Sequence, residues 1–332
     1  MNSTRKSFAL VAFVATITVS VLTGCSSTAG TDTGSTAVPT VRMATEPWIG
    51  YGPWWIAKDQ GLFAKNGLNV EQTTFNADAD LNAAFVSGKM DVANVATHTA
   101  LRMLASGVKL KVVMIEDVSM TADSIVSPAG ITTVKQLKGK DVAYEKGTTS
   151  DLLLNYALAQ NDMTIADINP VPMAAADAGA ALIGGKVTAA VTYEPYITTA
   201  LAQGGGYHRL FTAGKQPGLI SDVLIVSEAF AKKNPSAVTD LTKAWGLATN
   251  YYNTNSKSGR AIISAAVSAD AASLSTAFDG VKLYTLADNQ KNFSGAFLKT
   301  TVPLVMKAAI GAGILEKSVD FSGSFDGTFL GK

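Results

Sequence analysis

The feature that most constrains the fold is an alternation of strand-like and helix-like segments that begins at Thr40. Short runs with apolar or β-branched residues, at 41–44 and 68–75, are accompanied by longer runs with helical spacing, at 54–63 and 78–86. Such alternation is typical of α/β folds whose sheets are largely parallel. We therefore predict an α/β fold, with a mostly helical C-terminal part.

A short pattern occurs twice, at 85–93 and at 182–190: an apolar helix end, a glycine turn and a short buried strand. Glycine after a helix supplies the left-handed conformation that other residues resist. Any α/β protein can reuse this turn, but two similar α/β lobes also explain the repeat, and we favour that interpretation. We expect lobe one at 40–127, lobe two at 128–222, and a return to lobe one with C-terminal helices at 223–332.

Composition argues against a nucleic-acid partner, and chain length argues for more than one globular unit. Of the 332 residues, 47% are hydrophobic and 16% are charged, and the formal net charge is +1. Nucleic-acid binding requires clustered Lys and Arg, which a near-neutral chain of this kind does not provide. A chain of this length also exceeds the size at which one compact domain is the default. We expect more than one globular unit and no nucleic-acid partner.

The N-terminal segment has the features of an export signal. Two basic residues precede an apolar run at 8–21, which is short for a membrane span. The run ends in Leu-Thr-Gly-Cys at 22–25, which resembles a bacterial lipobox, where the cysteine is acylated after cleavage in front of it. We expect residues 1–24 to be a lipoprotein signal peptide and Cys25 to be the lipidation site; an uncleaved anchor helix is the alternative.

The segment 25–39 is rich in Ser, Thr and Gly and is expected to form a flexible tether. Cys25 is the only cysteine of the chain, which makes an internal disulfide or a thiolate metal cluster impossible. No later apolar run reaches spanning length. We expect attachment to the extracytoplasmic side of the cell membrane through the lipid anchor only.

Five stretches of the body stand out, at 48–63, 88–91, 137–143, 147–150 and 193–196. Together they resemble the nitrate/sulfonate/taurine-type periplasmic binding proteins. They follow one another in the family's order between residues 40 and 230, and this order is more specific than any one of them. The resemblance implies a type II periplasmic binding protein fold, in which two α/β lobes enclose a ligand cleft and the chain crosses between them twice.

The stretch 117–123 further resembles an Asp-x-Ser-x-x-Ala-Asp pattern in one branch of that family. Thr121 stands where the branch usually has glycine, and Thr188 stands where the second copy of the repeat usually has aspartate. These departures concern the ligand more than the fold.

The resemblance implies a monomeric solute-binding lipoprotein that delivers a small-molecule ligand to the permease of an ABC transporter. The ligand would be a small polar nitrogen or sulfur compound, of sulfonate, nitrate or taurine type or amine- or guanidine-like. A pyrimidine-precursor (thiamine-related) binding protein or enzyme on the same fold is the alternative. The chain has neither a Gly-x-Ser-x-Gly elbow nor a phosphate-binding loop. We predict that it is not an enzyme and uses no cofactor.

Two segments that open predicted helices offer hydroxyl and backbone N–H groups to an anionic or carbonyl oxygen. Thr148 and Thr149 lie in one segment, and Thr97 and His98 lie in the other. Each threonine is equally suited to cap its own helix. His98 and His208 are the only histidines and have no ligand partner in sequence, so no metal site is predicted.

Aromatic and acidic residues complete the candidate ligand contacts. Trp48 and Tyr51 lie in a Gly- and Pro-rich loop, where rings can line a cleft or hold a cation. Asp117 and Asp123 flank a loop after a strand, and Glu194 follows a buried strand, where open α/β sheets place ligand groups. These carboxylates favour a ligand with N–H donors or positive charge. Alternatively, they cap local turns or a neighbouring helix.

Overall fold

The computed structural model describes residues 38–331. The expected signal peptide at 1–24, the lipidation site Cys25 and the tether as far as residue 37 lie outside the described residues. Within 38–331, no helix combines the length and the apolar character that a membrane crossing requires.

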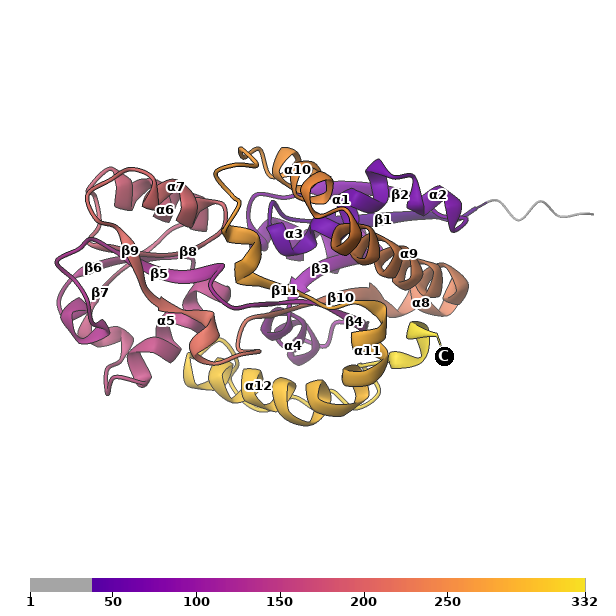
Figure 1. The fold of residues 1–332 in the computed structure, drawn as a ribbon. Helices are drawn as coiled ribbons and strands as arrows, with labels where there is room; N and C mark the ends of the chain where they lie inside the picture. The colour runs from indigo at the N-terminus through magenta and orange to yellow at the C-terminus, as the bar shows by residue number, and fades with distance from the viewer. Residues whose placement is uncertain (1–37, 332) are drawn as a thin grey trace, which may run out of the picture. The chain divides into compact units, whose positions relative to one another are not determined.

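The first lobe is built on one mixed sheet (Figure 1). Its strands are β1 (Thr40–Thr45), β2 (Asn69–Thr74), β3 (Val92–Ala96), β4 (Leu110–Ser119), β10 (Ser221–Ser227) and β11 (Val281–Leu283). They are ordered β11-β4-β10-β3-β1-β2. β1 pairs in parallel with β2 and β3, whereas β10 is antiparallel to both β3 and β4. The return of the chain as β10 therefore places a late strand in the middle of the sheet.

Helices cover this sheet and form most of the C-terminal part. They are α1 (Gly52–Asp59), α2 (Leu62–Lys65), α3 (Asp78–Val86), α4 (Thr97–Ala105), α8 (Glu228–Lys233), α9 (Pro235–Thr254), α10 (Ser256–Ala266), α11 (Leu286–Asn292) and α12 (Val302–Gly311), with the shorter turns η1 (Ile49–Tyr51), η5 (Ala277–Gly280) and η7 (Gly327–Leu330) and the π-helical η6 (Phe293–Thr301). Pro303 lies in the first turn of α12, which follows directly on the π-helical η6.

The second lobe is a smaller mixed sheet with its own helices. Its strands are β5 (Asp123–Ser127), β6 (Asp141–Tyr144), β7 (Asn169–Pro172), β8 (Ala189–Tyr193) and β9 (His208–Thr212), and its helical segments are α5 (Thr149–Ala159), α6 (Ala175–Ile183), α7 (Tyr196–Leu201), η2 (Val134–Leu137) and η3 (Ile165–Asp167). The strands are ordered β7-β6-β8-β5-β9. The repeated pattern forms α3–Gly88–β3 in one lobe and α6–Gly185–β8 in the other, with glycine φ values of 75° and 64°.

The chain crosses between the lobes twice, and the two crossings are bonded to each other. Residues 120–122 join β4 to β5, and residues 213–220, which include η4 (Ala213–Lys215), join β9 to β10. The Gly214 N–H donates to the Met120 carbonyl (2.5 Å), and the Ser119 N–H donates to the Ile220 carbonyl (3.1 Å). We call these two stretches the crossing segments.

Strand β5 corrects the expected boundary of lobe one at residue 127. The strand pairs with β8 and β9 and therefore belongs to the second sheet, and the first crossing occurs before it. Its apolar, β-branched composition predicts a buried strand but does not specify which sheet receives it. The return strand likewise begins at Ser221 rather than at residue 223.

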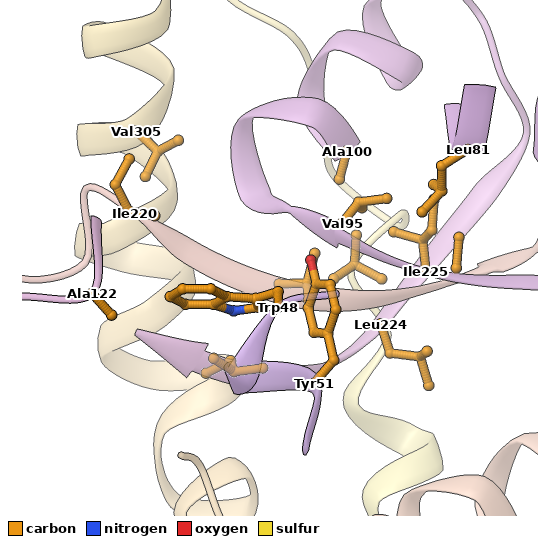
Figure 2. Packing of buried hydrophobic residues seen from close by; sticks show 14 of the residues in the cluster. Trp48, Tyr51, Leu81, Val95, Ala100, Ala122, Ile220, Leu224, Ile225 and Val305 are labelled. Carbon is orange, nitrogen blue, oxygen red and sulfur yellow. The ribbon is translucent and has the colours of Figure 1, made fainter. Parts of the chain in front are cut away.

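The core of the first lobe surrounds Trp54 and Trp245, which are fully buried with ring centroids 4.9 Å apart. Trp55, the next residue on α1, is 8% exposed, so both tryptophans of this helix are packed into the core. The same cluster extends to Trp48 and Tyr51 at one edge (Figure 2). These two rings lead from the core to the candidate site.

Candidate functional site

A small cavity lies where the ends of the two sheets face each other. Its lining residues come from both lobes: Glu46, Trp48, Tyr51, Asp78, Ala96, Asp123, Thr149, Tyr193, Ile220 and Asp222. Its volume is about 30 Å³, room for roughly two water molecules or a ligand of a few heavy atoms. Residues of β1, β3 and β8 enter at or just after the carboxyl ends of those strands, which is where open α/β sheets bind ligands.

Aromatic rings from both lobes meet at this cavity. Trp48 of the first lobe and Tyr193 of the second are 5.8 Å apart in an edge-to-face arrangement with an interplanar angle of 83°. Tyr51 lies beside Trp48 (Figure 2), and its backbone N–H donates to the Trp48 carbonyl at 3.0 Å. The predicted pair of ring contacts, Trp48 and Tyr51, therefore lines the cavity, joined by Tyr193.

The orientation of Trp48 is set by Asp117, which lies behind it. Trp48 Nε1 donates to Asp117 Oδ2 at 3.1 Å, and Asp117 is 1% exposed. A Cβ atom on Gly50 would collide with both partners of this hydrogen bond. Gly50 thus leaves the space in which the indole and the carboxyl meet, and Asp117 contacts the ring instead of lining the cavity.

Four of the ten lining residues are acidic and come from different elements. Glu46 follows β1, Asp78 opens α3, Asp123 opens β5 and Asp222 lies at the start of β10. The carboxyl group of Glu46 lies near that of Asp78, and the carboxyl group of Asp222 lies near that of Asp117. Two neighbouring carboxylates repel each other, so each pair favours a state in which one carboxyl carries a proton.

Burial raises the pKa values of these acids. Burial raises the pKa of Asp123 to about 7. The neighbouring Ser119 offsets part of this rise, and the charge of Glu194 adds to it. Burial and repulsion from Asp117 raise the pKa of Asp222 well above its ordinary value. Burial and repulsion from Asp78 do the same to the pKa of Glu46. Burial therefore favours the protonated forms of these acids.

The threonine pair at the start of α5 divides between the two predicted roles. Thr148 is the N-cap of α5, and its hydroxyl accepts a hydrogen bond from the Ser150 N–H at 3.3 Å. Thr149 lines the cavity, where it lies near Asp123 and offsets part of the rise that burial causes in that residue's pKa.

Three other candidates lie outside the cavity lining and have partners of their own. Thr97 Oγ1 donates to the Ser221 carbonyl at 3.0 Å and so ties α4 to β10. His98 is 1% exposed, and burial with the nearby Arg102 charge lowers its pKa to about 3. Glu194 is fully buried and forms a 2.6 Å ion pair with Arg209.

Four polar or aromatic lining residues were not predicted from the sequence: Glu46, Asp78, Tyr193 and Asp222. Glu46 and Tyr193 stand at strand ends and could have been found from that signal. Asp222 could not, because its place depends on β10 returning between β3 and β4. Among residues 38–331, no group of three or more His, Cys, Asp or Glu side chains is arranged to hold a metal ion.

Comparison with known proteins identifies the family. Residues 34–268 match the NMT1-like family, and the chain belongs to it. A relative from Escherichia coli strain K12, a putative aliphatic sulfonates-binding protein, is 30% identical over 183 residues. This match covers 54% of the chain and 57% of that relative, so the chain spans a little over half the length of the curated relatives it matches.

Solved structures identify the fold. The periplasmic aliphatic sulphonate binding protein of Escherichia coli superimposes with a TM-score of 0.72 at 22% identity, over 88% of this chain and 98% of that one. The periplasmic nitrate-binding protein of Synechocystis PCC 6803 gives a TM-score of 0.69 at 16% identity, over 85% and 84%. The predicted periplasmic binding protein fold is confirmed.

Proposed function

We propose that this protein is the solute-capturing component of an ABC importer and holds a small polar solute between its two lobes. The observation that carries the proposal is the cavity whose lining comes from both lobes. Capture needs convergent polar groups and a closing motion but no nucleophile, and the site supplies convergent polar groups. Family membership and the periplasmic binding protein fold support the same role.

Contacts across the cavity support a closing mechanism. Arg102 Nη1 on α4 donates to the Gly147 carbonyl of the second lobe at 2.9 Å. The Trp48–Tyr193 ring contact also joins the lobes. Opening would break both contacts and bend the chain at the crossing segments. A solute that touches both linings binds the closed form more tightly and shifts the equilibrium toward it.

A larger groove has a volume of about 550 Å³. Its lining includes Pro47, which follows Glu46 in the chain, Pro195 and Tyr196, which come shortly after Tyr193, and the segment 266–270. We propose that the solute reaches the cavity from this groove.

The proposal includes the anchor and the partner. Cys25 would carry a lipid that holds the body on the extracytoplasmic face of the cell membrane, where a permease receives the closed, solute-loaded form. We propose that it acts there as a monomer. Metabolic labelling with a radioactive fatty acid should mark the wild-type chain and leave Cys25→Ala unlabelled. Equal labelling of both would contradict the anchor.

The capture role is tested by thermal melting of the purified full chain with Cys25→Ser, which removes the acylation site. The panel contains nitrate, methanesulfonate, taurine, methylammonium, guanidinium, urea and a pyrimidine. A solute that binds only the folded protein raises the midpoint as its concentration rises. We expect at least one solute to do so saturably and to be recovered unchanged. A panel without any such solute, or a chemically altered product, would contradict the proposal.

A further inference from the structure

We propose that the captured solute is a small organic cation with N–H donors, an alkylammonium or guanidinium group, held by the carboxyl groups of Glu46, Asp78, Asp123 and Asp222 against aromatic rings. The inference rests on the proposed function and adds the charge and chemical class of the solute.

The acidic side chains of the lining are the first evidence for a cationic solute. Acidic side chains make up four of the ten lining residues, and the other six are aromatic, apolar or hydroxyl-bearing. Burial raises the pKa of Asp78, and the nearby charge of Arg102 offsets only part of that rise. Arg102 Nη1 itself donates to the Gly147 carbonyl. Ionised carboxyl groups would repel an anionic solute, whereas a cation favours their ionised form and balances its charge.

Asp222 supplies the second piece of evidence, because it lacks a donor. It lines the cavity and is 4% exposed, and within residues 38–331 the groups that act on its pKa, after burial, are carboxyl groups, led by that of Asp117. Asp117 in turn accepts from Trp48 Nε1. Buried acceptors are costly when no donor reaches them, so the oxygen of Asp222 that faces the cavity is suited to an N–H group from the solute.

The rings and the size of the cavity define the rest of the ligand. The faces of Trp48, Tyr51 and Tyr193 can attract a cation and cover its apolar surface. A volume of about 30 Å³ admits a group of a few heavy atoms. A planar guanidinium places several N–H donors around a small centre, which suits carboxyl oxygens that converge from different elements.

Binding of a cation should release protons. The charged or titratable groups near the four carboxyls are Glu116, Asp117, Glu145, Glu194, Arg102, Tyr51, Tyr193 and Tyr196. Burial raises the pKa of Asp123 to about 7, so this acid is partly protonated in the empty site near neutral pH. A cation favours the ionised form, which becomes more populated as pH rises. Affinity for the cation should therefore increase between pH 6 and pH 8.

Isothermal titration calorimetry of the full chain with Cys25→Ser tests the charge directly. Guanidinium and methylammonium chlorides are compared with sodium nitrate, methanesulfonate and taurine at pH 6 and pH 8, and with calcium and zinc chlorides. We expect saturable binding of an organic cation, at least tenfold tighter at pH 8, with proton release seen as a heat that depends on the buffer. Binding of an anion alone would overturn the inference and leave solute capture intact, metal binding alone would overturn the organic class, and no binding would count against the proposed function itself.

Asp222→Asn separates binding from folding. The amide keeps the shape and removes the charge, so we expect cation affinity to fall at least tenfold and fewer protons to be released. Without solute, the same variant should melt at a higher temperature, because the substitution removes a buried carboxyl group that has no hydrogen-bond donor. Asp162→Asn, which removes an exposed carboxylate, should change neither property. Unaltered cation affinity in Asp222→Asn, or weaker binding together with a lower melting temperature, would contradict the assignment.

Discussion

Asp123 and Asp222 are each 4% exposed, and they line the same cavity from different lobes. Water cannot solvate their charges there, so burial raises both pKa values. An acid with a raised pKa in the folded protein binds protons more tightly than it does in the unfolded chain. Its contribution to stability is complete below the unfolded pKa and disappears as pH rises through the folded pKa.

The solute-free protein should therefore lose stability as pH rises. For Asp123 the loss extends from its ordinary pKa of 3.8 to about 7, and the other raised acids add to it. We expect the melting temperature to fall between pH 5 and pH 8, with a shallower fall in Asp222→Asn. Differential scanning calorimetry measures both slopes. A midpoint that rises over this range would contradict the protonated state of the empty cavity.

Gly50 allows a second prediction about single residues. Its substitution by alanine would force apart Trp48 Nε1 and Asp117 Oδ2, since the new Cβ meets both atoms. We expect a loss of about 1–3 kcal/mol in the free energy of unfolding, together with weaker solute binding. Gly130→Ala is the matched control, because a Cβ there meets nothing within 4 Å. Chemical denaturation of both variants checks the difference; equal stabilities would count against the close approach.

Among the elements, α5 shows how one short segment serves packing and binding separately. Thr148 caps the helix, while Thr149 reaches the cavity. Thr148→Ala should reduce the free energy of unfolding by about 1 kcal/mol and leave solute affinity nearly unchanged. Thr149→Val should weaken binding more than it affects stability. A reversed pattern in urea denaturation and calorimetry would show that the two roles are exchanged.

The sequence predicted elements more successfully than it predicted their partners. The strand–helix alternation and the glycine turns at Gly88 and Gly185 indicated the α/β fold, because local periodicity and left-handed glycines are local properties. The assignment of Asp123–Ser127 to the first lobe was wrong, because a strand's composition does not encode which sheet it joins. Asp222 was missed for the same reason, since its neighbours Asp117 and Asp123 are distant in sequence.

Across the whole molecule, solute capture as proposed requires the two lobes to move about the crossing segments. Each lobe has its own sheet, and the hydrogen bonds between Gly214 and Met120 and between Ser119 and Ile220 join the two crossings. The Trp48–Tyr193 and Arg102–Gly147 contacts join the lobes and would form on closure. The free energy for closure would come from the solute, whose positive charge neutralises carboxyl groups contributed by both lobes.

Closure of the lobes by a cation can be measured by small-angle X-ray scattering of the full chain with Cys25→Ser, with and without a saturating organic cation at pH 8. We predict that the radius of gyration decreases when the cation is added. Asp222→Asn should need a much higher cation concentration for the same decrease. Identical scattering curves for the empty and the solute-saturated protein would contradict this closure.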